Sequence, residues 1–417
     1  MTPGALAVEP LAGRPDATVP LPGSKSLTNR ALVAAALADG SSRLEGALLA
    51  DDTEAMAEGL RALGAGVQVA GDALVVDGGV RREGPVAVDA RLSGTTSRFL
   101  LPVLALGEGP ATLDGGAPLR RRPMGPLLDA LRSLGASVEG DALPVTVRGP
   151  MRGGTVRLPG DVSSQFLSGL LLAAPRVDGG LRVEVTTPLV SAPYVAMTAA
   201  VMGTFGVEVA RDGDAWVVPE APYRATDHVI EPDASAASYF FAAAVLTGGR
   251  VTVPGLGRGS VQGDLAFVDV LERMGATVER LGDRTTVAAG SRLTGVDVDL
   301  SALSDTAQTL AAVAVFADAP TRVSGIGFVR GKETDRLAAV VQELRRVGVQ
   351  AEETADGFVV HPGTPRPAVV ETYGDHRMAM SFALLGLRVP GIAIADPGCV
   401  AKTFPGFWDA LDGLRRG

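Results

Sequence analysis

The chain has 417 residues, which exceeds the length at which a single hydrophobic core usually stops growing, so two domains are expected. Apolar residues make up 46% of the chain and charged residues 20%, the balance of a well-packed globular protein. The formal net charge of −9 argues against a general nucleic-acid-binding protein. A single cysteine, Cys399, excludes an internal disulfide and any metal site built from several cysteines.

Other features of the composition argue against metals, cofactors and membranes. The N-terminal residues lack the basic segment and apolar core of a signal peptide, and no apolar run reaches the length of a membrane span. Three histidines and one cysteine argue against a zinc site, and the chain has neither a complete P-loop nor a Rossmann glycine fingerprint. We therefore predict a cytoplasmic monomer with no metal, no cofactor and no nucleic-acid or membrane partner.

The first predicted element is a helix that begins after Ser24. The Pro-Gly pair at 22–23 breaks the preceding chain, Ser24 is a suitable N-cap, and the alanine-rich run 31–37 favours helix. Polar side chains crowd its first turns, where free N–H groups and the positive end of the helix dipole attract anions. They are Lys25, Ser26, Asn29 and Arg30. An ordinary capped surface helix is the alternative interpretation.

A pattern repeats along the chain at intervals of about 70 residues. Five times, a helix-like segment ends at a glycine that is followed by alternating apolar residues. These glycines are Gly64, Gly135, Gly206, Gly275 and Gly348, and the steps between them are 71, 71, 69 and 73 residues. An alternating segment with a turn signal in its middle follows each glycine and predicts a β-hairpin. The predicted hairpins span residues 67–76, 138–147, 207–218, 278–287 and 351–360.

A second series interleaves with the first. Small polar residues open an almost wholly apolar helix six times, at Ser24, Gly94, Ser163, Ser235, Asp305 and Asp375. Each copy therefore combines a buried helix, a strand, an amphipathic helix and a hairpin. Apolar helices that need burial on all sides fit a closed arrangement better than a repeat solenoid. If the copies are related by rotation, their positive helix ends face a shared centre that attracts anions.

The sixth copy ends where its hairpin should begin, and segment 5–19 could supply the missing β-structure. The two termini would then lie together, and copies one to three would form a domain inserted into the other. We predict an inserted domain at residues 22–227 and a discontinuous domain that combines residues 1–21 and 228–417.

Lysine is rare in this chain, and its positions are informative. Only three of the 38 basic residues are lysines, and each lies beside other chemically capable residues. Arginine forks suit carboxylates and phosphates, and the compact lysine ammonium suits phosphates. Cations gather at the polar helix starts and in nearby loops, at Lys25, Arg30, Arg98, Arg120, Arg121, Arg122, Lys332, Arg336, Arg377 and Lys402. Of the arginine run 120–122, we expect only Arg122 to contact a ligand.

Few carboxylates accompany these cations. Asp305 lies at a polar helix start, and Glu333 lies within the Lys-Glu-Thr-Asp-Arg run at 332–336. Neighbouring cations keep a carboxylate ionised, which suits a general base. In the alternative interpretation, Glu333 and Asp335 only satisfy a helix N-terminus. Together with the neutral donors at 163–165, these groups predict group transfer between two small, highly anionic substrates.

Several motifs have a recognisable order along the chain. They read Leu-Pro-Gly-Ser-Lys-Ser-Leu-Thr-Asn-Arg-Ala-Leu from residue 21, Val-Ser-Ser-Gln-Phe-Leu from 162, Arg-Gly-Lys-Glu-Thr-Asp-Arg-Leu from 330, Gly-Asp-His-Arg-Met-Ala-Met from 374 and Ala-Lys-Thr-Phe-Pro from 401. They resemble the family of 5-enolpyruvylshikimate-3-phosphate synthase, or 3-phosphoshikimate 1-carboxyvinyltransferase, over residues 21–411. The resemblance implies an α/β fold of two domains, each with three βαβαββ repeats around buried helices, like an inverse α/β barrel. It also implies an active site in the cleft between the domains.

The activity implied by this resemblance is a step of the shikimate pathway to chorismate and the aromatic amino acids. The enolpyruvyl group of phosphoenolpyruvate would pass to the 5-hydroxyl of shikimate 3-phosphate, and phosphate would be released. The reaction would proceed by addition and elimination through a tetrahedral intermediate.

The resemblance also implies residue roles. Shikimate 3-phosphate would contact Lys25, Ser26, Arg30, Ser163, Ser164, Ser191, Asp305 and Lys332. Phosphoenolpyruvate would contact Lys25, Gly94, Arg122, Gln165, Arg336, Arg377 and Lys402. Asp305 would act as the base at the 5-hydroxyl, Glu333 would donate a proton to the methylene carbon, and Lys25 would share in the proton transfer.

Two other functions remain open from the sequence. The related transferase that acts on UDP-N-acetylglucosamine usually carries a reactive cysteine before the residue that matches Arg122, and residues 119–121 contain none. A non-catalytic anion-binding relative is the second alternative. It would gain nothing from Asp305 and Glu333 among its cations.

Overall fold

The computed structural model describes residues 4–80 and 84–415 of the chain. Contacts between Cα atoms divide it into two compact units. Gly23–Glu231 form one, called the inserted unit, and Met1–Pro22 with Pro232–Gly417 form the other, called the terminal unit. No helix in the described part of the chain is both long and apolar enough to cross a membrane.

The second crossing between the units falls after Glu231 rather than after residue 227. His228–Val229 form the short strand β14, which pairs in parallel with β3 (Ser41–Glu45) of the inserted unit. The N–H of Ile230 extends this pairing with a 2.8 Å hydrogen bond to the carbonyl of Glu45. These residues therefore belong to the inserted unit.

Helices α1 (Lys25–Leu37), α3 (Gly94–Leu104) and α6 (Ser164–Ala173) form the core of the inserted unit. Nearly all of their residues are buried, as expected for helices that are apolar on every side. Each begins at a serine N-cap whose hydroxyl accepts a backbone N–H, as Ser24 does from Leu27 at 3.4 Å. The other helices of its described part are α2 (Asp51–Ala62), α4 (Ala117–Arg120), α5 (Gly125–Ser133), α7 (Ala192–Thr204) and the 3-10 helix η1 (Ala174–Arg176).

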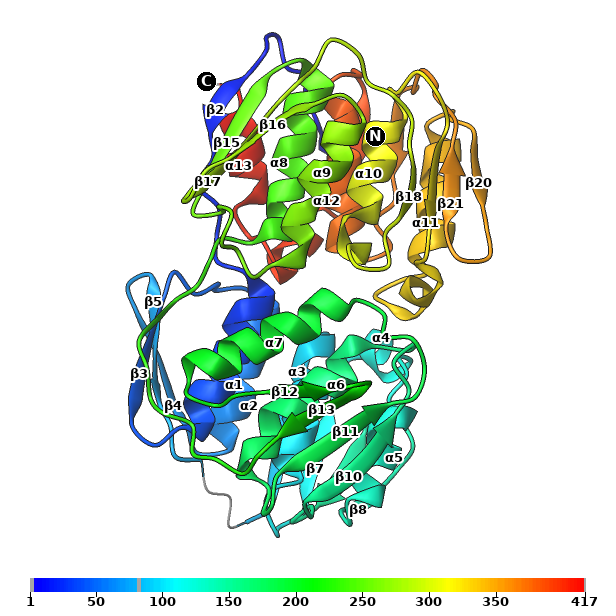
Figure 1. The fold of residues 1–417 in the computed structure, drawn as a ribbon. Coiled ribbons are helices and arrows are strands. Elements are labelled where there is room, and N and C mark those ends of the chain that lie inside the picture. The colour runs from blue at the N-terminus through cyan, green and yellow to red at the C-terminus, as the bar shows by residue number, and fades with distance from the viewer. Residues whose placement is uncertain (1–3, 81–83, 416–417) are drawn as a thin grey trace. The chain divides into compact units, whose positions relative to one another are not determined.

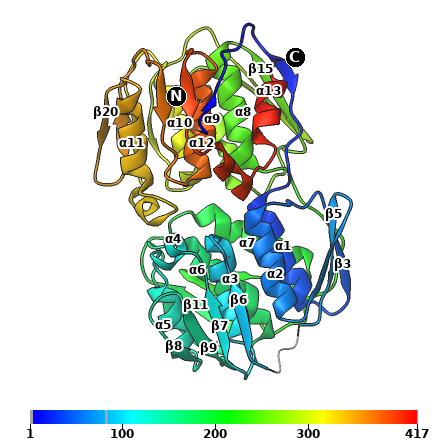
Figure 2. The same ribbon diagram turned by 180° about the vertical axis from the view of Figure 1, so that it is seen from behind.

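Small sheets lie on the outside of the inserted unit (Figures 1 and 2). Their strand orders are β14-β3-β5-β4, β6-β7-β9-β8 and β10-β11-β13-β12, and in each a parallel pair is joined to an antiparallel hairpin. Besides β3 and β14, the strands are β4 (Gly66–Ala70), β5 (Ala73–Asp77), β6 (Val86–Asp89), β7 (Ala111–Asp114), β8 (Ser137–Glu139), β9 (Val145–Arg148), β10 (Gly154–Leu158), β11 (Leu181–Val185), β12 (Ala210–Asp212) and β13 (Ala215–Val218).

The terminal unit follows the same plan around α8 (Ala234–Thr247), α10 (Ala307–Ala314) and α12 (His376–Gly386). Its other described helices are α9 (Phe267–Arg273), α11 (Arg336–Arg346) and α13 (Phe407–Gly413), with the 3-10 helices η2 (Gly263–Ala266), η3 (Ser304–Thr306), η4 (Gly327–Gly331) and η5 (Pro397–Lys402).

The sheets of the terminal unit have the orders β16-β17-β15-β2, β18-β19-β21-β20 and β1-β23-β22. Their strands are β1 (Leu6–Ala7), β2 (Asp16–Thr18), β15 (Arg250–Pro254), β16 (Thr277–Arg280), β17 (Arg284–Ala288), β18 (Asp297–Asp299), β19 (Thr321–Ser324), β20 (Ala351–Glu353), β21 (Phe358–Val360), β22 (Ala368–Val370) and β23 (Ile392–Ile394).

The repeat predicted from the sequence is confirmed. The five predicted hairpins are present as β4–β5, β8–β9, β12–β13, β16–β17 and β20–β21. The N-terminal segment supplies β1, which pairs with β23 of the last repeat, and β2, which pairs with β15 of the fourth. In the same way β14 completes the first repeat of the inserted unit. The α/β class, with three βαβαββ repeats around buried helices in each unit, is therefore also confirmed.

Three predicted helix starts differ in detail from the structure. Helix α3 has its N-cap at Ser93, one residue before Gly94, and α8 has its N-cap at Asp233, before Ser235. The Asp233 carboxylate accepts the Ala236 N–H at 2.9 Å, a stronger cap than a serine hydroxyl supplies. Asp305 lies in η3, a turn that leads directly into α10.

An arginine packs against the glycine that follows the C-terminal end of several outer helices. The glycine that follows α7, Gly206, has a φ of +82°, and a Cβ atom there would lie 3.1 Å from the Cδ of Arg224. The Arg224 N–H also donates to the Phe205 carbonyl at 2.9 Å. Gly135 with Arg152 and Gly348 with Arg366 repeat this arrangement. The cation lies near the negative end of the helix dipole, so many arginines of this chain have a structural role.

This arrangement predicts opposite effects for two substitutions near the end of α7. Gly206→Ala should lower the free energy of unfolding by about 1–2 kcal/mol, because this position has a left-handed backbone that alanine adopts only with strain, and the new Cβ would press on Arg224. Gly203→Ala should instead raise it by up to about 1 kcal/mol, because Gly203 is helical and exposed, with open space at its Cβ position. Urea denaturation measures both changes. Equal effects of the two substitutions would contradict this description of the helix end.

Candidate functional site

Arg336, the first residue of α11, lies at the centre of an ion-pair network in the terminal unit. Its Nε donates to Oδ2 of Asp375 at 2.7 Å, and its Nη1 donates to Oδ1 of Asp305 at 3.1 Å. Its Nη2 donates to Oε2 of Glu333 at 2.9 Å. Asp375 is the N-cap of α12, so the starts of three helices meet at one guanidinium.

The network is buried, but its members differ in exposure. The side chains of Arg336 and Asp375 are 4% and 0% exposed, whereas those of Asp305 and Glu333 are 17% and 15% exposed. Burial opposes the charge of Arg336, but the carboxylates of Asp375, Glu333 and Asp305 outweigh it and raise its pKa. Asp375 is therefore a structural anion, and Asp305 and Glu333 are the carboxylates that a ligand can reach.

Asp305 is held between two arginines. Its Oδ2 accepts a 2.6 Å hydrogen bond from Nη2 of Arg377. The other terminal nitrogen of Arg377, Nη1, donates to the phenol oxygen of Tyr239 at 3.4 Å. Arg377 is 5% exposed, and its own N–H is bound by Asp375 at 2.9 Å. The predicted residues Asp305, Glu333, Arg336 and Arg377 are thus brought together by the fold.

The acidic residues before α11 have different roles. Asp335 is the N-cap of α11, and its Oδ1 accepts the N–H groups of Leu337 and Ala338, both at 3.1 Å. For Asp335, the interpretation as a residue that satisfies a helix N-terminus is therefore correct. Glu333 instead forms an ion pair with Arg336.

Each of the two lysines of the terminal unit lies at the end of a 3-10 helix. Lys332 follows η4, which packs against α11, and it directly precedes Glu333. Lys402 is the last residue of η5, which packs against α12, and it is 7% exposed.

In the inserted unit, Arg30 is a buried cation with neutral partners. It is 2% exposed and donates to the hydroxyl of Thr198 at 2.8 Å, to the carbonyl of Tyr194 at 3.0 Å and to the carbonyl of Ser26 at 2.8 Å. Within the described residues, no carboxylate forms an ion pair with Arg30. Burial lowers its pKa to about 10, which still leaves it charged at neutral pH. A buried cation with neutral partners is suited to binding an anion.

Lys25 at the start of α1 has an acidic neighbour that the sequence analysis missed. Its Nζ lies 3.3 Å from Oδ2 of Asp52, and the two side chains are 13% and 4% exposed. Asp52 stands in an acidic run at the start of α2, where such residues ordinarily serve the helix dipole. No local signal distinguishes it from Asp51.

Gly94 allows two arginines to approach the start of α3. A Cβ atom at Gly94 would lie 2.5 Å from Nη1 of Arg122 and 2.7 Å from Nη1 of Arg98. Arg98 donates to the Gly94 carbonyl at 3.0 Å and to the Pro123 carbonyl at 3.1 Å. The backbone of a helix N-terminus and two guanidinium groups therefore meet at this glycine, which favours anion binding there.

The neutral donors lie on the adjoining helix starts. Ser163 is the N-cap of α6, Ser164 is its first residue, and the Gln165 amide donates to the hydroxyl of Thr95 at 3.3 Å. Ser191 precedes α7 and has a φ of +51°.

Further partners were also missed by the sequence analysis. Ser168 on α6 and Thr198 on α7 fix Arg30, and Asp375 fixes Arg336. All three lie on the predicted repeat helices, so the repeat could locate them, but only the packing of separate helices reveals their partners.

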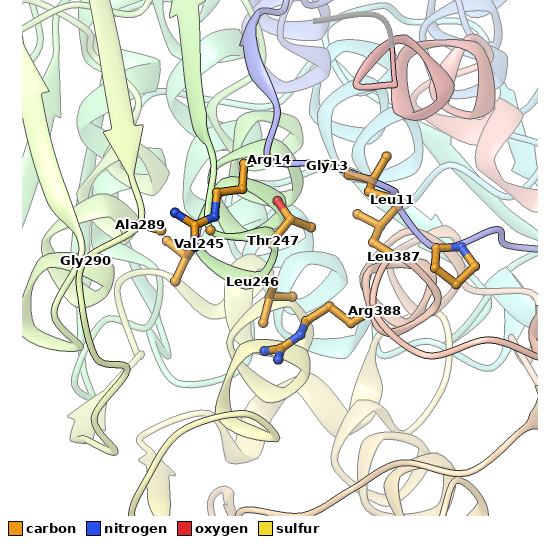
Figure 3. A pocket seen from close by; sticks show the side chains of 12 residues that line it. Leu11, Gly13, Arg14, Val245, Leu246, Thr247, Ala289, Gly290, Leu387 and Arg388 are labelled. Carbon is orange, nitrogen blue, oxygen red and sulfur yellow. The ribbon is translucent and has the colours of Figure 1, made fainter.

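A separate cavity of about 430 Å³ lies at the other ends of α8 and α12 (Figure 3). Arg14 and Arg388 line it, together with apolar side chains of the helix ends. Arg14 packs over Gly248 after α8, and Arg388 lies after α12, 4.3 Å from the ring centroid of Phe316. These arginines resemble those at the ends of the outer helices, so the cavity has a structural explanation and is not the candidate site.

Comparisons with known proteins agree on one family. The family described as EPSP synthase (3-phosphoshikimate 1-carboxyvinyltransferase) matches residues 12–411. A 3-phosphoshikimate 1-carboxyvinyltransferase of Nostoc punctiforme is 47% identical over 96% of both chains. One of Thiobacillus denitrificans is 46% identical over 98% of this chain and 99% of that chain.

Solved structures show the same similarity. An EPSP synthase from Acinetobacter baumannii has a TM-score of 0.83 and 26% identity, and covers 99% of this chain and 98% of its own. The enolpyruvyl transferase NikO from Streptomyces tendae, 22% identical with a TM-score of 0.78 over 99% of this chain and 98% of its own, shares the fold. The chain belongs to the EPSP synthase family.

Proposed function

We propose that this chain transfers the enolpyruvyl group of phosphoenolpyruvate to the 5-hydroxyl of shikimate 3-phosphate and releases phosphate. The observation that supports this most directly is the pair of reachable carboxylates, Asp305 and Glu333, inside a cluster of buried arginines. In a protein that only bound anions, these two carboxylates would lower the affinity for the anion. A transferase, in contrast, needs a base and an acid beside its anionic substrates. Curated relatives with this activity in their names match nearly the full chain.

Shikimate 3-phosphate is assigned mainly to the inserted unit. Its carboxylate suits Arg30, a buried cation held by neutral groups, with Ser26 beside it on α1. Its phosphate suits the hydroxyls and N–H groups of Ser163 and Ser164 at the start of α6. Lys25, Ser191, Lys332 and Asp305 complete the proposed set.

Phosphoenolpyruvate is assigned to the remaining cations and helix starts. The N-terminus of α3 at Gly94, Arg122 and Gln165 supply donors in the inserted unit. In the terminal unit, Arg336 and Arg377 suit its carboxylate because both present a planar fork. Lys25 and Lys402 complete the proposed set.

The proposed chemistry is an addition followed by an elimination. Asp305 takes the proton of the 5-hydroxyl while the hydroxyl oxygen attacks the second carbon of phosphoenolpyruvate. Glu333, which must be protonated once the substrate carboxylate engages Arg336, gives its proton to the methylene carbon. The resulting tetrahedral intermediate has a methyl group. Glu333 then takes back one methyl proton, phosphate departs with the proton held by Asp305, and the double bond is restored. Lys25 shares in these proton transfers.

Binding of phosphoenolpyruvate would itself prepare the base. The carboxylate of Asp305 is held by hydrogen bonds from Arg336 and Arg377. A substrate carboxylate that attracts these guanidiniums weakens their hold on Asp305, and a carboxylate with fewer cationic partners is a stronger proton acceptor.

The alternative function, transfer to UDP-N-acetylglucosamine, usually involves a reactive cysteine, and this chain has none at the matching position. Cys399 lies in η5, and burial raises the pKa of its thiol to about 12. At neutral pH it is therefore a weak nucleophile. The cytoplasmic location, the monomeric state and the absence of nucleic-acid and membrane partners remain predictions.

The proposal predicts phosphate release that needs both substrates. Purified protein should release inorganic phosphate when shikimate 3-phosphate and phosphoenolpyruvate are both present, and none when either is omitted. Absence of release at saturating concentrations would contradict the proposal. Release after UDP-N-acetylglucosamine replaces shikimate 3-phosphate would favour the related transferase instead.

A second prediction concerns Lys25. Lys25→Ala should lower kcat by about 100- to 10,000-fold, because the ammonium takes part in proton transfer and substrate binding. It should also destabilise the protein, because the ammonium beside the buried Asp52 is lost. The double variant Lys25→Ala with Asp52→Asn should recover stability but not turnover, as measured by thermal unfolding and phosphate release. Recovery of turnover in the double variant would contradict the role of Lys25.

A further inference from the structure

We propose that Glu343 and Tyr373 are positioning residues that hold the turn before α12, and through it Asp375 and Arg377, in the geometry that binds phosphoenolpyruvate. This inference rests on the proposed function, because that function assigns Arg336 and Arg377 to this substrate.

Glu343 is a fully buried carboxylate on α11 whose hydrogen-bond donors come mainly from this turn. Its Oε2 accepts the N–H of Glu371 at 2.9 Å, and its Oε1 accepts the phenol O–H of Tyr373 at 2.6 Å. Nε of Arg346 also donates to Oε2, at 2.8 Å. A carboxylate stays charged in the protein interior only if several good hydrogen-bond donors surround it. The hydrogen bonds between Glu343 and the turn are therefore strong.

Helix α11 holds the same turn at two points. Arg336 and Glu343 are seven residues apart, which is about two helical turns and places them on one face. Arg336 binds the carboxylate of Asp375 at one end of the segment, and Glu343 binds Glu371 and Tyr373 at the other. The geometry of the turn is therefore fixed by one rigid element.

The backbone of Tyr373 indicates that its side chain is needed. Its φ is +56°, and that of the following Gly374 is +69°, so two successive residues have left-handed backbones. Glycine adopts this conformation readily, whereas a tyrosine is strained in it. Tyr373 is also 39% exposed, so hydrophobic burial does not explain it. The remaining explanation is the hydrogen bond from its phenol to Glu343.

The phenol donates over the whole working range of pH. Desolvation of the phenol group beside the buried Glu343, together with the hydrogen bond between them, raises the pKa of Tyr373 to about 12. The phenol therefore stays protonated and keeps its bond to the carboxylate at neutral pH.

The turn leads directly to the candidate site. The Asp375 N–H donates to the Thr372 carbonyl at 2.9 Å, and the Asp375 carboxylate binds Arg336 and the N–H of Arg377. A shift of the turn would therefore move Asp375, which orients Arg336, and the start of α12, which carries Arg377.

The test compares tyrosine variants in the full chain. Tyr373→Phe removes the phenol oxygen, and Tyr373→Gly also relieves the backbone strain. Tyr223→Phe is the matched control, because it removes a buried phenol that donates to the Leu172 carbonyl at 3.0 Å in the inserted unit. For both Tyr373 variants we expect the KM for phosphoenolpyruvate to rise about tenfold, because one good hydrogen bond is lost. The KM for shikimate 3-phosphate should change less than twofold. Tyr223→Phe should change neither KM.

A purely structural role predicts a different result. If the turn required only a left-handed backbone, Tyr373→Gly would keep the wild-type KM for phosphoenolpyruvate and would be more stable, and the proposal would be wrong. Wild-type KM values in Tyr373→Phe would also overturn it.

A measurement independent of turnover separates this inference from the proposed function. Amide hydrogen exchange at residues 372–377 should be faster in Tyr373→Phe than in wild-type protein and in Tyr223→Phe. If wild-type protein releases no phosphate, the proposed function fails, and this exchange still decides the inference. Unchanged exchange at these residues would overturn it.

Discussion

The buried guanidinium of Arg336 is the constraint on which the terminal unit depends. It joins the starts of α10, α11 and α12 because the carboxylates of Asp305, Glu333 and Asp375 all accept hydrogen bonds from it. Removing a carboxylate from such a network leaves a buried cation poorly compensated, so the three helices are held in one relative arrangement. The same network leaves two carboxylates within reach of a ligand, and this links the stability of the unit to its chemistry.

The inserted unit solves the problem of buried charge differently. Arg30 is enclosed by hydroxyls, carbonyls and the rings of Phe99 and Tyr194, so neutral groups compensate its burial, and a substrate anion would complete its coordination. Lys25 has a carboxylate partner in Asp52, which fixes its position. Among the residues that the structure describes, the inserted unit thus presents in Arg30 a cation whose hydrogen-bond partners are neutral, and the terminal unit presents carboxylates among cations. This is the division of charge that two anionic substrates and an acid–base step require.

The repeat and the helix starts could be predicted because hydrophobic periodicity, caps and turns are local properties of the sequence. The five hairpins and the β-structure of the N-terminal segment followed from them. The strand at His228–Val229 did not, because two residues have no periodicity and their partner β3 lies far away in the sequence. Asp52 and Glu343 were missed for a related reason. Asp52 stands in the acidic first turn of α2, and Glu343 is one of several charged residues on the amphipathic helix α11, so only the packing shows what each binds.

The central claim is that Asp305 moves a proton, and steady-state kinetics of Asp305→Asn beside the exposed control Asp297→Asn test it most directly. We predict that kcat falls by about 100- to 10,000-fold in Asp305→Asn. The KM for phosphoenolpyruvate should not rise, because the amide no longer competes with the substrate for Arg336 and Arg377. Asp297→Asn should leave both constants unchanged. A near-normal kcat in Asp305→Asn, or a loss confined to KM, would contradict the account.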